Sequence, residues 1–155
     1  QAVGLVKLLA REFPSFNDVA FYEAQPVYFY KRAQILVGDL YGAFLGEDWG
    51  RFPDIDQLTA FADYKVPQVL RRLGMLSYSQ ELQSILRRRQ QIPAGHPLEV
   101  EIRAGTIWAV EELRRALLQL GVRRHAFELD WYLWELGQQP AENDEPYHLT
   151  RTIFY

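Results

Sequence analysis

The chain has 155 residues, of which 48% are apolar and 24% charged, and its 17 basic and 20 acidic residues give a formal charge of -3. This length and composition indicate a single folded domain and exclude a disordered chain, and the acidic balance argues against a general duplex-binding protein. The absence of cysteine excludes disulfides, thiolate metal sites and cysteine nucleophiles.

The sequence shows neither a pattern typical of a membrane span nor one typical of a metal site. No apolar run approaches the length that spans a bilayer, and no signal peptide is visible, so we expect a cytoplasmic protein with no membrane partner. The three histidines, His96, His125 and His148, do not have metal-ligand spacing. The chain starts with Gln1 and runs straight into a helical pattern, so we expect it to be part of a longer protein.

The first half of the chain shows mainly helical periodicity. Residues 3–13 predict a short amphipathic helix that ends at Pro14, and residues 16–30 are mixed, with a short extended piece after Pro26. Residues 31–45 predict a helix, because apolar side chains recur on one stripe. A further helix is expected from Asp54, which with Gln57 resembles a capping box, to about residue 64.

The second half of the chain is also expected to be helical. Pro67 suits the first turn of a helix that ends at Gly74, so this helix and the preceding one would meet in a tight hairpin at residues 63–66. More helices are predicted over residues 79–89, 98–120 and 125–137. Residues 138–150 predict an exposed acidic loop, and the apolar residues within 151–155 suit docking back onto the body. No strand alternates convincingly, so the expected fold is a single all-α domain over residues 1–155.

Asp63 is the first candidate for a functional residue. It lies at the expected helix–helix turn, beside the aromatic residues Phe61 and Tyr64. The free N–H groups and the positive dipole end of the following helix would keep a carboxylate there ionised. Asp63 is therefore a candidate catalytic carboxylate, and simple helix capping is the alternative.

Lys31 is the second candidate, because it begins a predicted helix. Gly38 and Gly42 lie on the same face of that helix, and small residues below a charged one leave room for a ligand. The alternative is close helix packing against the glycines, with Lys31 in solvent. An ammonium at a helix N-terminus is slightly unfavourable, so we expect a carboxylate partner nearby.

Two charged residues interrupt apolar helix faces. Arg103 lies on the apolar stripe of the longest helix, where an unpaired guanidinium would be costly, so it requires a core carboxylate or an anionic ligand. Asp130 lies between Phe127 and Trp134 on the last helix. A carboxylate among aromatics suits recognition of a flat base by stacking and hydrogen bonding. The alternative is a buried ion pair between Asp130 and an arginine such as Arg103.

Five strings of the chain resemble the queuosine salvage protein family. They occur in the family's order and cover most of the chain: residues 29–37 (FYKRAQILV), 56–70 (DQLTAFADYKVPQVL), 101–111 (EIRAGTIWAVE), 130–134 (DWYLW) and 151–155 (RTIFY). Members of the family are longer than this chain, which resembles their C-terminal half.

The resemblance implies a queuosine 5′-phosphate N-glycosylase. Such an enzyme hydrolyses the bond between ribose 5-phosphate and the deazaguanine base, and it releases queuine for reuse in transfer RNA. The resemblance also implies a fold like that of helix-hairpin-helix DNA glycosylases, which agrees with the hairpin expected at Asp63. The family's catalytic carboxylate maps to Asp63, its lysine to Lys31 and its base-contacting carboxylate to Asp130.

The chemistry of the residues adds further candidates for this site. Phe61, Tyr64 and Trp134 would line the substrate site, and either Arg103 or Arg151 would bind the phosphate. The expected partner is a small nucleotide, queuosine 5′-monophosphate, with no cofactor, no metal and no stable nucleic-acid complex, while the oligomeric state stays open. Two alternatives remain: a helix-hairpin-helix module that binds nucleic acid, and a catalytically inactive helical scaffold.

Overall fold

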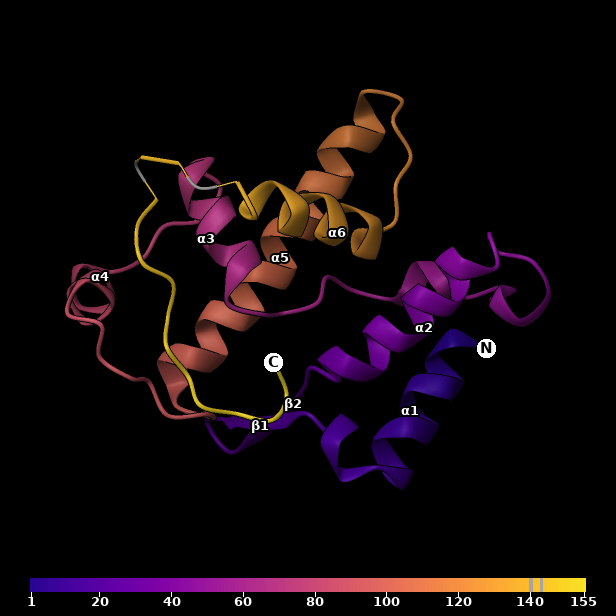
Figure 1. The fold of residues 1–155 in the computed structure, drawn as a ribbon, viewed down its shortest axis with the longest axis horizontal. Coiled ribbons are helices and arrows are strands. Elements are labelled where there is room, and N and C mark those ends of the chain that lie inside the picture. The colour runs from indigo at the N-terminus through magenta and orange to yellow at the C-terminus, as the bar shows by residue number, and fades with distance from the viewer. Residues whose placement is uncertain (140, 143) are drawn as a thin grey trace.

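A computed structural model describes residues 1–139, 141–142 and 144–155 of the chain (Figure 1). In these residues six α-helices, one pair of strands and three 3₁₀ turns follow one another. The helices are α1 (Ala2–Glu12), α2 (Lys31–Ala43), α3 (Lys65–Arg72), α4 (Gln80–Arg87), α5 (Pro97–Gln119) and α6 (Ala126–Gly137). The strands are β1 (Val19–Tyr22) and β2 (Gln25–Tyr28), and the 3₁₀ turns are Pro14–Phe16, Asp48–Gly50 and Ile55–Gln57. Within the described residues no helix is both long and apolar enough to cross a membrane.

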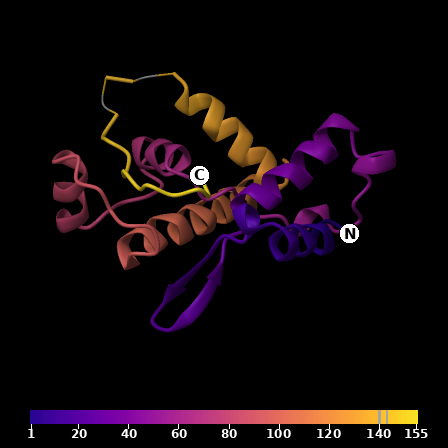
Figure 2. The same ribbon diagram turned by 60° about the horizontal axis from the view of Figure 1, so that its bottom comes forward.

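The β-hairpin shows that the expected all-α fold was wrong. β1 and β2 pair in antiparallel register, from Val19 opposite Tyr28 to Tyr22 opposite Gln25, and the hairpin projects from the body of the molecule (Figure 2). Its two turn residues, Glu23 and Ala24, both have positive φ, 47° and 63°. Two-residue hairpin turns of this kind usually contain Asn-Gly or Asp-Gly. The sequence therefore lacked the usual turn signal, and four-residue strands are too short to show a clear alternation.

The second error concerns the helix expected from Asp54 to about residue 64. Only the single 3₁₀ turn Ile55–Gln57 forms there, and residues 58–63 are neither helix nor strand. The carboxylate of Asp54 does not begin a local helix, because it accepts hydrogen bonds from the backbone N–H groups of Ala2 (2.7 Å) and Val3 (3.2 Å) at the start of α1. The structure thus has no helical hairpin at Asp63 and gives no support to a DNA-glycosylase-like fold.

Residues 58–63, which we call the central segment, run where three hydrophobic clusters meet. Phe61 packs into the cluster of α1 and α2, Ala60 into that of α3, α5 and α6, and Ala62 into one that includes the hairpin and α5. Side chains of the surrounding helices satisfy its backbone: the Thr59 N–H donates to Gln34 Oε1 (2.8 Å) and the Phe61 N–H donates to Asp130 Oδ2 (2.9 Å). The position of the segment is therefore fixed on several sides.

The chain after α6 only partly matches the exposed acidic loop expected over residues 138–150. Pro140 and Asn143 lie outside the described residues, and residues 138–139 and 141–142 are exposed. From Asp144 to Thr150 the residues are half-buried or buried. Asp144 pairs there with Arg72, and Glu145 pairs with Arg71 and Arg87. The last residues then return along α5 to the start of α2, as the position of the C-terminus shows (Figure 1).

Candidate active site

Asp63 sits at the end of the central segment, directly before α3. Its Oδ1 accepts hydrogen bonds from the N–H groups of Lys65 (2.8 Å) and Val66 (2.9 Å), so it does cap the helix. The residue is only 4% exposed. Burial raises the pKa of the Asp63 carboxyl, while the Val66 N–H, the charge of Lys31 and the Lys65 N–H oppose this rise. Within the described residues Oδ2 accepts no hydrogen bond.

Asp130 approaches the same segment from α6. Its Oδ2 accepts the Phe61 N–H, two residues before Asp63, and the residue is 3% exposed. Burial, and then the negative charge of Asp63, hold the pKa of Asp130 well above its ordinary value. Two buried carboxyl groups thus sit at one site, and the environment favours the neutral form of Asp130.

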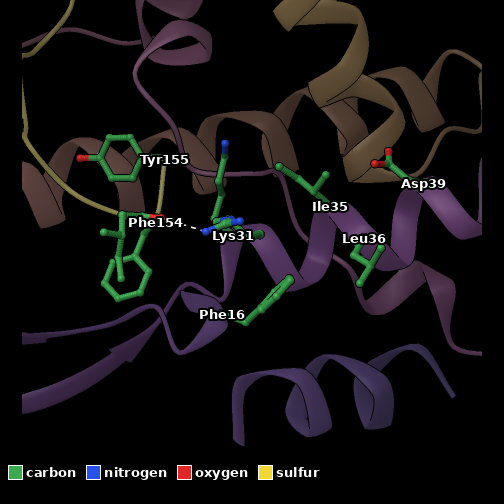
Figure 3. A pocket seen from close by; sticks show the side chains of 9 residues that line it. Phe16, Lys31, Ile35, Leu36, Asp39, Phe154 and Tyr155 are labelled. Carbon is green, nitrogen blue, oxygen red and sulfur yellow. Dashed lines mark hydrogen bonds between the residues drawn. The ribbon is translucent and has the colours of Figure 1, made fainter. Parts of the chain in front are cut away.

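Lys31 supplies the positive charge of the site from the first turn of α2. Burial lowers its pKa, while the charges of Asp63 and Asp130 raise it, so the field of the ammonium reaches both carboxyl groups. In Figure 3 the side chains of Lys31 and Asp39 extend to one side of α2 and that of Leu36 to the other. The structure therefore brings together Lys31, Asp63 and Asp130, which lie far apart in the sequence.

Aromatic rings fill the space that the sequence left beside the α2 glycines. A Cβ atom on Gly38 would lie 3.2 Å from Cζ of Phe61 and 3.5 Å from Cζ2 of Trp131, and one on Gly42 would lie 3.3 Å from Cη2 of Trp131. The two glycines thus serve close packing of α6 and the central segment, the alternative considered for them. The sequence places Trp131 on the same face of α6 as Asp130 and Trp134, but it carries no signal for the contact of Trp131 with these glycines.

Tyr64 follows Asp63 directly in the chain, and Trp134 lies about one turn after Asp130 on α6. Tyr64 is 38% exposed, and its ring packs against that of Tyr147 at a centroid distance of 4.9 Å. Trp134 is 47% exposed on α6. Both leave much of an aromatic ring open, in contrast to Phe61, which is buried.

Arg103 is buried next to Ala62, the residue before Asp63, and does not face solvent. It is 2% exposed, and its guanidinium pairs with Asp18 rather than with Asp130. Asp18 was not identified from the sequence, since a carboxylate in a loop before a short strand has no periodic signal. The expected need of Arg103 for a carboxylate partner is met inside the protein.

Two cavities flank the C-terminal residue. One, of about 440 Å³, borders Lys31 (Figure 3) and is lined by Phe16, Lys31, Arg32, Ile35, Leu36, Asp39, Ile153, Phe154 and Tyr155. The other, of about 420 Å³, borders Tyr64 and is lined by Tyr64, Gln91, Tyr147, His148, Leu149, Thr150, Arg151 and Tyr155. Tyr155 is a wall of both, and each is large enough for a small ligand. In the described part of the chain, no three carboxylate or imidazole groups are placed to hold a metal ion.

Comparison with known proteins gives consistent matches over the whole chain. A family model described as queuosine salvage protein matches residues 1–155. A queuosine 5′-phosphate N-glycosylase/hydrolase of Sphaerobacter thermophilus is 60% identical over 154 residues, which are 99% of this chain and 48% of that protein. Proteins of the same name from Dictyostelium discoideum and Schizosaccharomyces pombe are 46% and 43% identical, over 97% and 90% of this chain and 47% and 40% of their own length. The chain spans about half the length of the curated relatives it matches.

Proposed function

The chain belongs to the queuosine salvage protein family, and from this premise we propose that it carries the catalytic centre of a queuosine 5′-phosphate N-glycosylase. The observation that carries the proposal is the cluster of Asp63, Asp130 and Lys31 on the central segment and the helices beside it. Asp63 and Asp130 are buried and Lys31 is half-buried. Burying ionisable groups together costs free energy, and such groups concentrate at functional sites.

Hydrolysis of the nucleotide breaks the bond between C1′ of the ribose and the base nitrogen. The bonding electron pair leaves with the base, and positive charge develops on the sugar. The ionised Asp63 stabilises that charge and accepts a proton from the water whose oxygen bonds to C1′. The products are ribose 5-phosphate and queuine, and the proton balance closes when the departing base takes up a proton.

The two carboxyl groups suit different roles because their surroundings differ. Asp63 faces a helix N-terminus, two backbone N–H groups and Lys31, all of which favour the ionised form. Asp130 receives one backbone N–H and faces the charge of Asp63, so it retains a proton more readily. This separation supports Asp63 as the base and Asp130 as the group that hydrogen-bonds the nucleobase.

The remaining parts of the substrate fit the edge of the cluster. The exposed rings of Tyr64 and Trp134 offer stacking surface, whereas Phe61 is buried in the cluster of α1 and α2. Arg151 lines the cavity beside Tyr64 and Tyr155, whereas Arg103 is engaged by Asp18. We therefore assign the phosphate to Arg151.

Release of queuine from queuosine 5′-monophosphate, followed by chromatography, tests the activity. It is measured on the 155-residue chain alone and on the chain supplied with the half of the Sphaerobacter thermophilus relative that it does not match. Asp63→Asn should lower the rate at least about a hundredfold, because the base and the sugar-stabilising charge are lost.

Asp54→Asn is the matched control for Asp63→Asn. Asp54 also accepts two backbone N–H groups at a helix start, so this variant carries the same substitution at a similar cap. Its rate should stay within about twofold of the wild type, since capping alone is worth only about 1 kcal/mol of stability. Queuine release by neither form of the wild-type chain, or equal rates for Asp63→Asn and wild type, contradicts the proposal.

We further propose a cytoplasmic protein that acts on the free nucleotide and forms no stable complex with nucleic acid. The nucleic-acid alternative depended on a helical hairpin at Asp63, and residues 58–63 form no helix. A transfer RNA gel shift at low salt should show no retarded band, whereas a salt-sensitive complex would revive that alternative.

A further inference from the structure

The guanidinium of Arg103 joins two segments that carry the proposed catalytic groups. From the second turn of α5 it donates through Nη1 and Nη2 to the two carboxylate oxygens of Asp18, at 3.0 and 2.5 Å. Its Nε donates to the carbonyl oxygen of Ala62 at 3.1 Å, and Ala62 directly precedes Asp63. One rigid planar group therefore contacts both the loop before β1 and the end of the central segment.

Asp18 extends this connection to Lys31. Its Oδ2 accepts the backbone N–H of Lys31 at 3.2 Å, and its carbonyl oxygen accepts the N–H groups of Phe29 (3.0 Å) and Tyr30 (3.1 Å). Tyr30 enters α2 in the left-handed region, with φ of 47°, and caps the helix with no side-chain hydrogen bond. A non-glycine residue holds such a backbone only where its surroundings impose it, and Asp18 provides that constraint.

The surroundings of Arg103 are built to keep it in this position. Its guanidinium lies 3.9 Å from the ring centroid of Phe29 and 4.7 Å from that of Tyr155, and Glu99 Oε1 lies 3.5 Å from Nη1. The group is thus stacked on rings and paired with carboxylates that are themselves buried. A group so engaged positions its neighbours and does not bind a ligand.

We propose that Asp18 and Arg103 form a positioning pair that fixes Lys31 and Asp63 relative to each other for catalysis. The chain of contacts runs from the Lys31 N–H through Asp18 and Arg103 to the Ala62 carbonyl, so it spans both groups without touching the substrate. This role rests on the proposed function. Because misplacement by about 1 Å can lower a rate a hundredfold, loosening the pair lowers kcat and leaves KM nearly unchanged.

The kinetic test replaces Arg103 by lysine, which keeps the charge but cannot reach Asp18 and Ala62 together. Queuine release is measured as a function of queuosine 5′-monophosphate concentration. We expect Arg103→Lys to lower kcat at least about tenfold with KM within about threefold. Asp18→Glu, which keeps the charge but lengthens the arm, provides a second variant if Arg103→Lys fails to fold, and it should lower kcat in the same way.

Arg114→Lys is the matched control. Arg114 lies on the same helix and contacts both carboxylate oxygens of Glu111, with two bonds of 2.7 Å, on the partly exposed side of α5. Its kcat and KM should stay within about twofold of the wild type. A rise in KM of Arg103→Lys with an unchanged kcat would assign Arg103 to substrate binding and overturn the proposal.

A second measurement separates this inference from the proposed function. Hydrogen exchange is followed at three backbone amides. The Lys31 N–H donates a hydrogen bond to Asp18, and the Lys65 and Val66 N–H groups donate to Asp63. Arg103→Lys should exchange faster at all three than the wild type and Arg114→Lys, whether or not queuine is released. Unchanged exchange at these amides would overturn the positioning pair, whereas absent queuine release by the wild type would refute only the enzyme activity.

Discussion

At the residue scale, Lys31 and the carboxyl groups of Asp63 and Asp130 shift one another's pKa values. The ammonium favours the ionised form of both acids, and both acids favour the charged form of Lys31, while burial opposes each of them. A change at one of the three therefore alters the titration of the others. Two predictions follow from the directions of these shifts.

The first prediction is a displaced pH–rate profile for Lys31→Met. The proposed base, Asp63, must be ionised, so queuine release should rise with pH on the acidic side of the profile. Lys31 opposes the rise in the pKa of Asp63, so its removal should move this limb to higher pH. Lys7→Met, on the exposed face of α1, is the control and should leave the limb in place. An unmoved limb in Lys31→Met would argue against electrostatic contact between the two groups.

The second prediction concerns stability. The pKa of Asp130 is higher in the folded protein than in the unfolded chain, so the folded state holds the proton more tightly. The free energy of unfolding therefore falls as the pH rises from the unfolded pKa to the folded pKa of this group. Asp130→Asn cannot ionise and can still accept the Phe61 N–H through its carbonyl oxygen. The free energy of unfolding of this variant, from urea titrations at pH 5 and pH 7, should therefore depend less on pH. Equal pH dependence in the variant and the wild type would count against a raised pKa.

At the scale of elements, the helices with a clear apolar stripe could be predicted from the sequence. α2 and α5 begin and end within a few residues of the expected bounds, because their stripes and terminal residues agree. The hairpin was missed because Glu23-Ala24 is not a typical turn pair, and the helix from Asp54 failed because its capping carboxylate serves α1. The first error is one of local turn chemistry, whereas the interaction that decides the second is non-local.

The same distinction applies to the candidate site. Lys31 could be predicted because it begins a helix, Asp63 because it lies at an expected turn, and Asp130 because it interrupts an aromatic helix face. Each also lies in a family string. Their proximity, and the parts played by Asp18 and Trp131, depend on how α2, α5, α6 and the central segment pack. No spacing in the sequence encodes those contacts.

Packing between α2 and α6 gives the third prediction. Gly105→Ala on α5 should raise the free energy of unfolding by about 0.5–1 kcal/mol, because alanine favours helix and its Cβ would have ordinary contact with Leu76 at 3.4 Å. Gly38→Ala has the same propensity gain but would press on Phe61 at 3.2 Å, so it should show no gain or a loss. Urea denaturation compares the two variants, and an equal gain in both would contradict tight packing at Gly38.

At the scale of the whole molecule, the C-terminal residues connect elements from distant parts of the chain. Glu145 contacts α3 and α4, Leu149 pairs with the loop before α5, and the carbonyl of Ile153 accepts a hydrogen bond from Arg32 of α2 (3.2 Å). The Tyr155 hydroxyl then donates to Glu99 of α5 at 2.6 Å. The last twelve residues thus hold the helices around the two cavities.

Removal of that hydroxyl is the fourth prediction. Tyr155→Phe leaves a buried carboxylate of Glu99 without its short hydrogen bond and should lower the free energy of unfolding by about 1–3 kcal/mol. Tyr28→Phe, on the exposed face of the hairpin, is the control and should change it by less than about 0.5 kcal/mol. Both values come from urea titrations, and similar losses in the two variants would rule out a specific role for the Tyr155 hydroxyl.

The hydrogen bond between Asp130 and the Phe61 amide limits the distance between the Asp130 carboxyl group and Asp63. The carboxyl group assigned to the nucleobase is fastened to the main chain only two residues from the one assigned to the sugar. A polypeptide covers at most about 3.3–3.6 Å per residue, so these two residues of backbone measure no more than about 7 Å. Under the proposed assignment, the backbone from Phe61 to Asp63 sets the separation between the group for the base and the group for the sugar. One residue inserted there would change this separation even with every side chain retained.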